Sequence, residues 1–141
     1  MNLILNPGQT NTQKGVITLP AAVNLTGCEN LLWKIVNNNG ASGFALAARM
    51  TAGDLFVGAS GDLAGNTVAA EPLDINDQCQ VLLDGACHPG DLLALSTLNW
   101  GRLAVPAAGY GTGYYTFMAE QAGRPGQLLL VRRINDRAFT L

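Results

Sequence analysis

Residues 114–132, YYTFMAEQAGRPGQLLLVR, contain two strand-like segments separated by a run of turn-forming residues. The first segment is rich in aromatic and apolar residues, and the second, from Gln127, is apolar on both faces until it ends in arginine. Between them, residues 120–126 supply the glycines and the proline that favour a turn. These features predict an antiparallel strand pair and therefore a β fold.

The segments before residues 114–132 are also strand-like and are separated by turns. Residues 92–97 and 103–106 flank LNWGR, which we interpret as a hairpin tip in which Gly101 supplies a positive φ. Residues 78–83 begin with polar and apolar residues in alternation, as in a half-buried strand. Residues 31–36 are strand-like and are followed by a turn of asparagine and glycine. Further strands are expected at residues 44–50 and 55–57.

Helical periodicity is rare along the chain, and only residues 41–50 and 117–122 could hold a short helix. Parallel β-α-β units are disfavoured, because their crossovers need helices. We predict a single all-β domain, an antiparallel β-sandwich or barrel of jelly-roll-like form, over residues 21–134. Residues 1–20 would be an extended arm or a strand pair, and residues 135–141 a tail. The recurrence of Gly-Asp-Leu is interpreted as turn chemistry without a longer repeat.

The composition points to a protein whose surface contacts other protein. Only 13% of the residues are charged and 48% are hydrophobic, whereas about 25% charged is usual for soluble domains. Interfaces are depleted in Lys, Glu and Asp, so we predict a homo-oligomer or a member of a larger assembly. A net charge of −2 with eight basic residues disfavours nucleic acid as a partner.

The chain shows no secretion signal and no apolar run of the length that a membrane helix needs. Its three cysteines cannot all pair within one chain and lack the spacing of a zinc site. We therefore expect free thiols, synthesis in a cytoplasm, and no membrane partner.

Charge is unevenly distributed along the sequence. Seven acids and no Lys or Arg lie between Arg49 and Arg102, while four arginines and one acid lie between Arg124 and the end. The basic end could join like subunits head to tail or dock on an acidic protein surface.

One segment, DGACHPGDLLAL, places a thiol beside the only imidazole of the chain. In extended chain, Cys87 and His88 would point to opposite faces, which prevents their pairing as nucleophile and base. Pro89 and Gly90 fit the central positions of a type II turn. We therefore predict a turn with a small buried thiol, no catalytic residues and no enzymatic activity.

No metal or cofactor site is expected. The acids Asp54, Asp62, Asp74 and Asp77 fit no EF-hand spacing and are interpreted as turn caps. The glycine cluster at residues 109–113 lacks the Lys that follows in a phosphate loop.

The two tryptophans have different contexts. Trp33 lies within an apolar strand and is expected in the core. Trp100 lies at the predicted hairpin tip near Arg102, and both residue types are common interface anchors. An intersubunit role for Trp100 and a tip folded back on its own domain both stay open.

Residues 78–134 contain VLLDGACHPGDLLAL, the hairpin NWGRLAVPAAG and the closing YTFMAEQAGRPGQLLLVRRI. In this pattern a strand leads to a Gly-Asp-Leu turn, a glycine hairpin follows, and a last apolar strand ends the domain. The pattern resembles the small capsid decoration, or cement, proteins of tailed bacteriophages.

The resemblance implies a structural virion protein that forms dimers or trimers on the outer surface of the capsid. Its partner would be the major capsid protein, whose neighbouring subunits it would tie together. We expect the contacts to come from the N-terminal segment, the hairpin tip and the arginines: Leu3, Leu5, Lys14, Trp100, Arg102, Arg124, Arg132, Arg133 and Arg137. The alternatives are a receptor- or glycan-binding module of a phage tail, using Tyr110, Tyr114 and Tyr115, and a thiol-dependent enzyme.

Overall fold

The structure is a computed structural model that describes residues 15–48, 54–106, 112–114, 117–134 and 138–140. These residues form strands and connecting turns, which confirms the all-β antiparallel class. No helix that could cross a membrane occurs among them.

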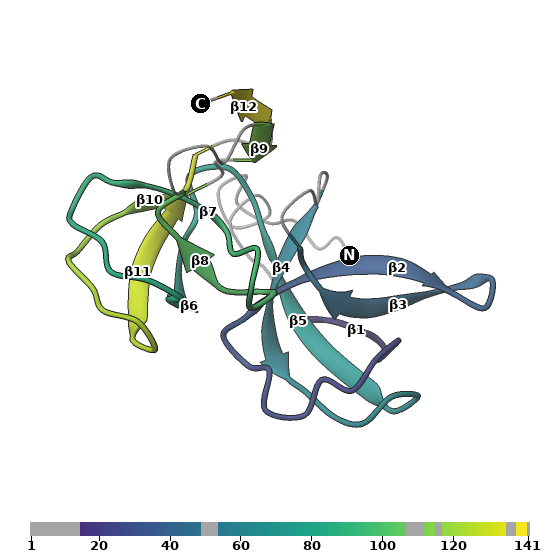
Figure 1. The fold of residues 1–141 in the computed structure, drawn as a ribbon. Coiled ribbons are helices and arrows are strands. Elements are labelled where there is room, and N and C mark those ends of the chain that lie inside the picture. Colours follow the sequence, from purple (N-terminus) through teal and green to yellow (C-terminus); the bar gives the residue numbers. More distant parts are fainter. Residues whose placement is uncertain (1–14, 49–53, 107–111, 115–116, 135–137, 141) are drawn as a thin grey trace, which may run out of the picture.

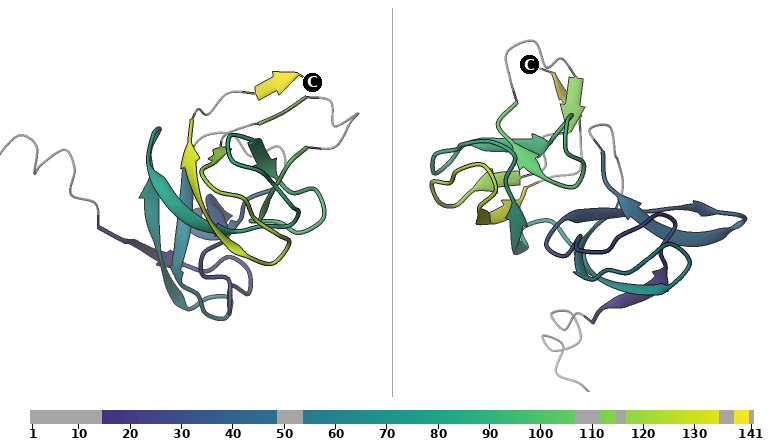
Figure 2. Two further views of the ribbon diagram at one scale, coloured as in Figure 1. Left: turned by 90° about the vertical axis from the view of Figure 1, so that its left-hand side faces the viewer. Right: turned by 60° about the horizontal axis from the view of Figure 1, so that its bottom comes forward.

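Two five-stranded antiparallel sheets lie beside each other, and a two-stranded ribbon lies at one end of the second sheet (Figures 1 and 2). The first sheet has the order β1-β5-β4-β2-β3 and the second β6-β11-β10-β7-β8. The strands of the first sheet are β1 Ile17–Pro20, β2 Leu32–Asn38, β3 Ala41–Leu46, β4 Leu55–Ser60 and β5 Thr67–Leu73. Those of the second are β6 Gln78–Leu82, β7 Leu92–Leu95, β8 Leu103–Ala104, β10 Phe117–Ala119 and β11 Leu128–Arg133, and the ribbon pairs β9 Thr112–Tyr114 with β12 Ala138–Thr140.

Several local predictions are confirmed. β10 pairs with β11, β7 pairs with β8, and the glycine of the tip between β7 and β8 has a φ of 83°. Both windows considered for a helix contain strands instead, β3 and β10. Cross-strand pairing decides these segments, because β3 pairs with β2 along its full length. β1 pairs with β5, while the proposed boundaries of arm, domain and tail stay predictions.

The two sheets have the same topology, strand for strand, when the ribbon is set aside. Each sheet also curls so that the residue after its first strand meets its third strand. These contacts are the parallel bridges of Ala21 with Phe44 and of Leu83 with Leu103. The described chain thus contains two copies of one five-stranded unit, a structural repeat that the recurrence of Gly-Asp-Leu did not predict. The connectivity also differs from a jelly roll, because each sheet uses consecutive strands.

The second sheet contains a shorter repeat as well. The turns HPGD and RPGQ, residues 88–91 and 124–127, have glycines with φ of 85° and 81°. Each turn closes with an amide-to-carbonyl hydrogen bond of 3.1 Å. The two segments lie antiparallel, with Cys87 bridged to Gly123 by two backbone hydrogen bonds of 3.0 Å. The predicted type II turn at Pro89 is therefore present, together with a counterpart related by an approximate two-fold.

Adjacent residues of the first sheet supply two different cores. Trp33 and Phe56 point into the curl of the first sheet, where they pack around Phe44 with ring centroids 5.5 and 5.2 Å apart. Their neighbours Leu32 and Leu55 point to the other face and join the core of the second sheet. The two sheets are therefore joined by a shared apolar core, and the expected burial of Trp33 is confirmed.

Candidate functional site

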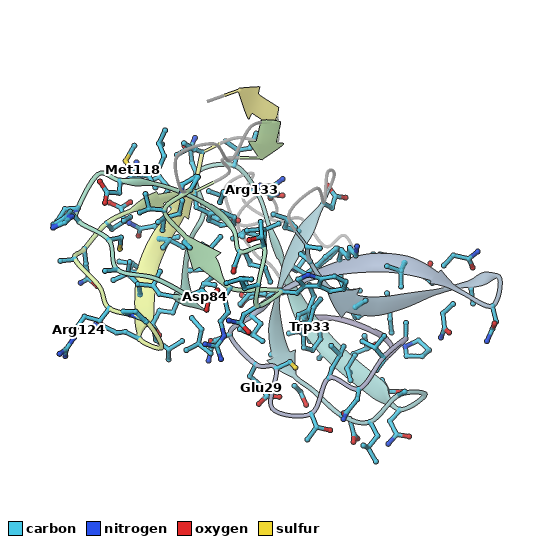
Figure 3. The ribbon with its side chains drawn as sticks, in the orientation of Figure 1. Glu29, Trp33, Asp84, Met118, Arg124 and Arg133 are labelled. Atoms are coloured by element: carbon cyan, nitrogen blue, oxygen red, sulfur yellow. The ribbon has the colours of Figure 1, made fainter. Side chains whose placement is uncertain are left out.

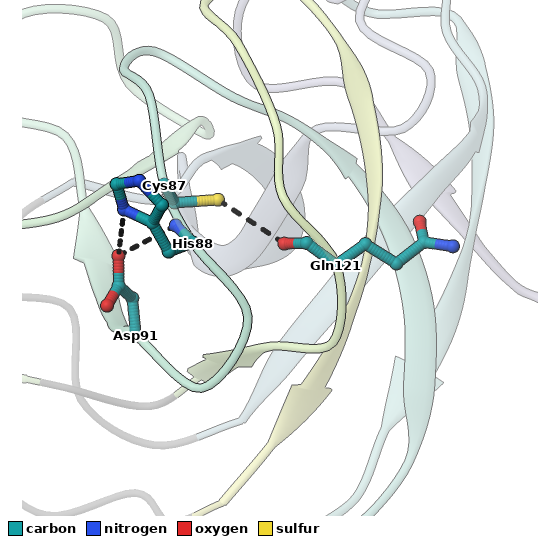
Figure 4. A network of polar contacts seen from close by, with 4 residues as sticks. All are labelled: Cys87, His88, Asp91 and Gln121. Atoms are coloured by element: carbon teal, nitrogen blue, oxygen red, sulfur yellow. Dashed lines mark hydrogen bonds and ion pairs between the residues drawn. The ribbon is translucent and has the colours of Figure 1, made fainter.

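The thiol and the imidazole of the turn at residues 87–91 point away from each other (Figure 4). The Cys87 thiol is directed at the carbonyl of Gln121, 3.8 Å away. The His88 side chain is 87% exposed and its Nδ1 lies 3.7 Å from the Asp91 carboxylate. Asp91 also accepts a hydrogen bond of 2.8 Å from the His88 amide, which caps the turn. The described geometry does not pair thiol and imidazole.

The environment of Cys87 keeps its thiol protonated. Its residue is only 4% exposed. Burial raises the pKa of the Cys87 thiol above its ordinary value, and the Asp91 carboxylate adds to the increase. A nucleophilic cysteine needs the opposite shift, because the thiolate is the reactive form. This site therefore does not favour the thiol-dependent enzyme.

All three cysteines are free, as predicted. Cys79 lines a hollow of about 320 Å³ between the sheets, together with Glu71 and Asp77. Burial, followed by the nearby Glu71 carboxylate, raises the pKa of Cys79 to about 12. Among the described residues, no three His, Cys, Asp or Glu side chains are grouped closely enough to hold a metal ion. The expectation that the chain uses no metal or cofactor stays a prediction.

The loop between β7 and β8, residues 96–102, is fixed to the second sheet by a polar network. Ser96 is buried, and its hydroxyl donates a short hydrogen bond to the Asp84 carboxylate. The Asn99 side-chain amide donates to the other oxygen of Asp84 at 2.7 Å. The Ser96 hydroxyl in turn accepts the amides of Leu98 and Asn99, both at 3.2 Å. Sequence reasoning missed this network, since its members are 12 and 15 residues from Asp84.

The same loop is also fixed to the first sheet. Gly101 is buried, and its amide donates to the Ala47 carbonyl at 2.8 Å. Its carbonyl accepts the Leu32 amide at 2.9 Å. The loop therefore lies across the junction of the two sheets and is rigidly placed.

This rigid loop exposes two large apolar side chains. Leu98 is 85% exposed and Trp100 is 56% exposed. The core side of the tip is thus occupied by Gly101, while Trp100 faces outward. The two options for Trp100 were an intersubunit role and a tip folded back on its own domain. In the described residues the indole is not buried in the core of its own domain. Arg102 follows at the base of the loop and is partly buried.

The arginines expected in an interface have different environments (Figure 3). Arg124 is exposed at the tip of its Pro-Gly turn, at the far end of the second sheet. Arg132 is exposed and pairs with Glu120 at 2.7 Å. Arg133 is only 4% exposed, and its Nη1 donates to the Leu73 carbonyl of the first sheet. In the isolated chain, Arg133 joins the two sheets.

The other residues expected in the interface or in the glycan-binding alternative cannot be placed. The backbone of Tyr114 lies in β9, but its side chain is not described. The remaining ones lie outside the described residues: Leu3, Leu5, Lys14, Tyr110, Tyr115 and Arg137.

An open groove of about 560 Å³ lies between the β2–β3 hairpin and Trp100. Val23, Lys34, Val36 and the asparagines of the hairpin turn also line it. Sequence reasoning did not predict this groove. Lys34, Val36 and Asn38 follow the buried Leu32 at two-residue spacing and are partly buried, and this spacing is the signal that could have indicated one partly covered face.

Neither protein-family models nor curated proteins match the sequence. Among solved structures, the chain is similar to the N base of the head fiber protein gp8.5 of bacteriophage phi29. The similarity has a TM-score of 0.66 and covers 92% of this chain and 100% of the other, at 17% sequence identity. The chain therefore shares the fold of that head fiber base.

Proposed function

We propose that the chain is a structural protein of a phage particle, which binds the outside of the head and stabilises contacts between major capsid subunits. The observation that carries this proposal is the fold shared with the head fiber base of phi29 over 92% of the chain. The resemblance of residues 78–134 to decoration proteins points to the same class.

The surface of the described residues supports a role in protein contacts. Its exposed large apolar side chains are spread over both sheets and include Val23, Ile35, Leu98 and Trp100. Trp is enriched among the residues that contribute most to binding, particularly when it is held in place before association. The loop that carries Trp100 is hydrogen-bonded to both sheets.

A decoration protein gains affinity by contacting several capsid subunits at once. Each additional contact forms within an already tethered complex, so modest contacts combine into tight binding. Separating two capsid subunits then also requires breaking the contacts that both make with the decoration. This is the mechanism by which such a protein would resist internal pressure.

The contacts with the major capsid protein are assigned to the N-terminal segment, the exposed arginines and the hairpin tip. Arg124 and Arg132 present their charges to solvent and are available to an acidic surface. Arg133 is left out of this set, because it is buried against the first sheet. Apolar strand edges would make the homo-oligomer.

The test measures how much purified protein binds to heads of the phage that lack it. Full-length chain should bind and should raise the temperature at which the heads open. Deleting residues 1–14, or changing Arg124 and Arg132 together to Gln, should lower the occupancy while the protein stays folded. Ser42→Ala, an exposed change on β3, is the matched control and should bind like the wild type.

Electron microscopy of the native particle separates head from tail. Density for the chain on the tail would support the receptor-binding alternative and overturn the proposal, as would heads that bind none of the purified protein. Occupancy that is unchanged in both variants would remove these segments from the interface.

A further inference from the structure

The groove beside Trp100 exists because the β2–β3 hairpin extends past the second sheet (Figure 1). Leu32 lies in the shared core, whereas Lys34, Val36 and Asn38 follow on the same face of β2 at two-residue spacing. The second sheet covers the beginning of this face and leaves its continuation open. The rigid loop with Trp100 closes the inner end of the resulting groove.

Several polar groups that line the groove have no partner among the described residues. Asn37 is occupied, since its Oδ1 accepts the Gly40 amide at 2.8 Å and shapes the hairpin turn. The side-chain amides of Asn38 and Asn39 and the ammonium of Lys34 make no hydrogen bond or ion pair with any described residue. Donors and acceptors are thus available along one wall of the groove.

The charge in the groove has one sign. Lys34 is its only charged lining residue, and none of the ten described lining residues is a carboxylate. Among the described lining residues, the Lys34 cation thus has no carboxylate beside it, which favours an anionic ligand.

The aromatic wall selects among anionic ligands. The indole of Trp100 is half exposed and lies on a loop fixed by hydrogen bonds, so it offers a flat apolar surface at low cost in conformational entropy. Sugar rings present flat C–H faces and a rim of hydroxyls, which match an indole and amide groups respectively. The volume of about 560 Å³ lies within the range of small-ligand sites.

We propose that this groove binds an anionic saccharide, with a sugar ring against Trp100, its acidic group at Lys34, and its hydroxyls at Asn38 and Asn39. This site goes beyond the proposed capsid role, and it shares Trp100 with the hairpin tip that is assigned to that role. A protein segment is the less favoured occupant, because Leu98, the most exposed apolar side chain of the described residues, does not line the groove.

Tryptophan fluorescence of the purified full chain reports on the groove directly. Trp33 is fully buried, so quenching by an added saccharide reports on Trp100. The probes are oligogalacturonate, its fully methyl-esterified neutral form, and a saccharide phosphate of similar length. Saturable quenching by the carboxylate or the phosphate probe, with clearly weaker quenching by the neutral form, is expected. The stronger of the two acidic probes identifies the type of anionic group.

Three variants assign the binding, which calorimetry measures. Trp100→Ala should weaken it by roughly tenfold, and Trp100→Phe should restore part of it. Lys34→Gln should weaken it by roughly threefold to tenfold and remove most of its salt dependence. The controls are Leu98→Ala, on the same loop outside the groove, and Arg124→Gln, an exposed cation elsewhere. Both should bind like the wild type.

Three results would overturn the proposal. The first is the absence of saturable binding by both acidic probes. The second is equal weakening by the groove variants and the two controls. The third is an oligomer that separates into monomers in Trp100→Ala, which would make the groove a contact between chains. Lys34 lies outside the segments assigned to the capsid, so loss of saccharide binding with normal head occupancy in Lys34→Gln keeps this inference distinguishable from the capsid role.

Discussion

Arg132 and Arg133 are neighbours in β11 whose side chains lie in opposite environments. Arg132 reaches solvent and pairs with Glu120, whereas Arg133 is buried and donates to the Leu73 carbonyl. Replacing Arg133 by Ala leaves a buried carbonyl without this donor and removes packing between the sheets. We expect a loss of about 2–4 kcal/mol of unfolding free energy.

The matched change Arg132→Ala removes an exposed ion pair and should lower stability by less than about 1 kcal/mol. Urea unfolding of both variants, followed by Trp33 fluorescence, measures the difference. Equal losses for the two arginines would contradict the role assigned to Arg133.

The raised pKa of Cys79 predicts that the stability of the fold depends on pH in the alkaline range. Its pKa of about 12 in the folded chain, against an ordinary thiol value of 9.0, means that folding favours the protonated thiol. The stabilisation is complete below pH 9 and falls as the pH rises toward 12, by about 1.4 kcal/mol per pH unit.

The wild type should therefore lose about 1.4 kcal/mol more than Cys79→Ala between pH 8 and pH 10. Urea unfolding at the two pH values gives this difference, and the other titrating groups cancel between the proteins. An identical loss in both would show that the thiol does not titrate differently on unfolding.

At the scale of elements, the close approach of β4 to β2 depends on a residue without a side chain. Gly58 is buried, and a methyl group there would overlap the Trp33 indole. Because the Trp33 indole is fully buried and packs on the Phe44 ring, it cannot move aside freely. Gly58→Ala should lower stability by about 2 kcal/mol or more.

Gly85→Ala is the control for this change, because its methyl group would meet Ala104 at an ordinary 3.7 Å. The midpoint temperature of thermal unfolding should change little in Gly85→Ala and fall strongly in Gly58→Ala. Similar midpoints for the two variants would show that the first sheet adapts to the added methyl.

Local patterns in the sequence predicted the strands and turns better than the long-range contacts. The β10–β11 pair, the Pro89 turn and the buried Trp33 follow from periodicity and turn chemistry over a few residues. The repeated topology could not be predicted in this way, because it consists of hydrogen bonds between strands that lie far apart in the sequence.

The candidate site was only partly predictable. Exposure of Trp100 was one of two options. The burial of Arg133 was not predicted, because this residue ends its strand and strand ends are normally solvated. The groove requires the hairpin to extend past another sheet, which is a property of the assembled fold.

At the scale of the whole molecule, the shared core makes the two sheets one cooperative unit. Leu55 belongs to β4, yet it packs in the core of the second sheet and is 2% exposed. Leu55→Ala should lower the global stability by about 2–4 kcal/mol. Amide hydrogen exchange should accelerate equally in β2 and β11, which lie in different sheets.

Acceleration confined to the first sheet would contradict this coupling and indicate two independently unfolding units. Val36→Ala is the control, since this side chain lines the open groove and does not belong to the shared core. It should change exchange in β11 by little.

The order of the two units along the chain also has a consequence for biosynthesis. The first five strands leave the ribosome before the second sheet exists, so Leu32, Ala47, Leu55 and Leu73 then have no cover. A nascent chain halted near residue 76 would expose this apolar face to solvent and attract chaperones. Completion of the second unit buries this face, so the full-length chain should no longer bind the chaperones that bind its first half.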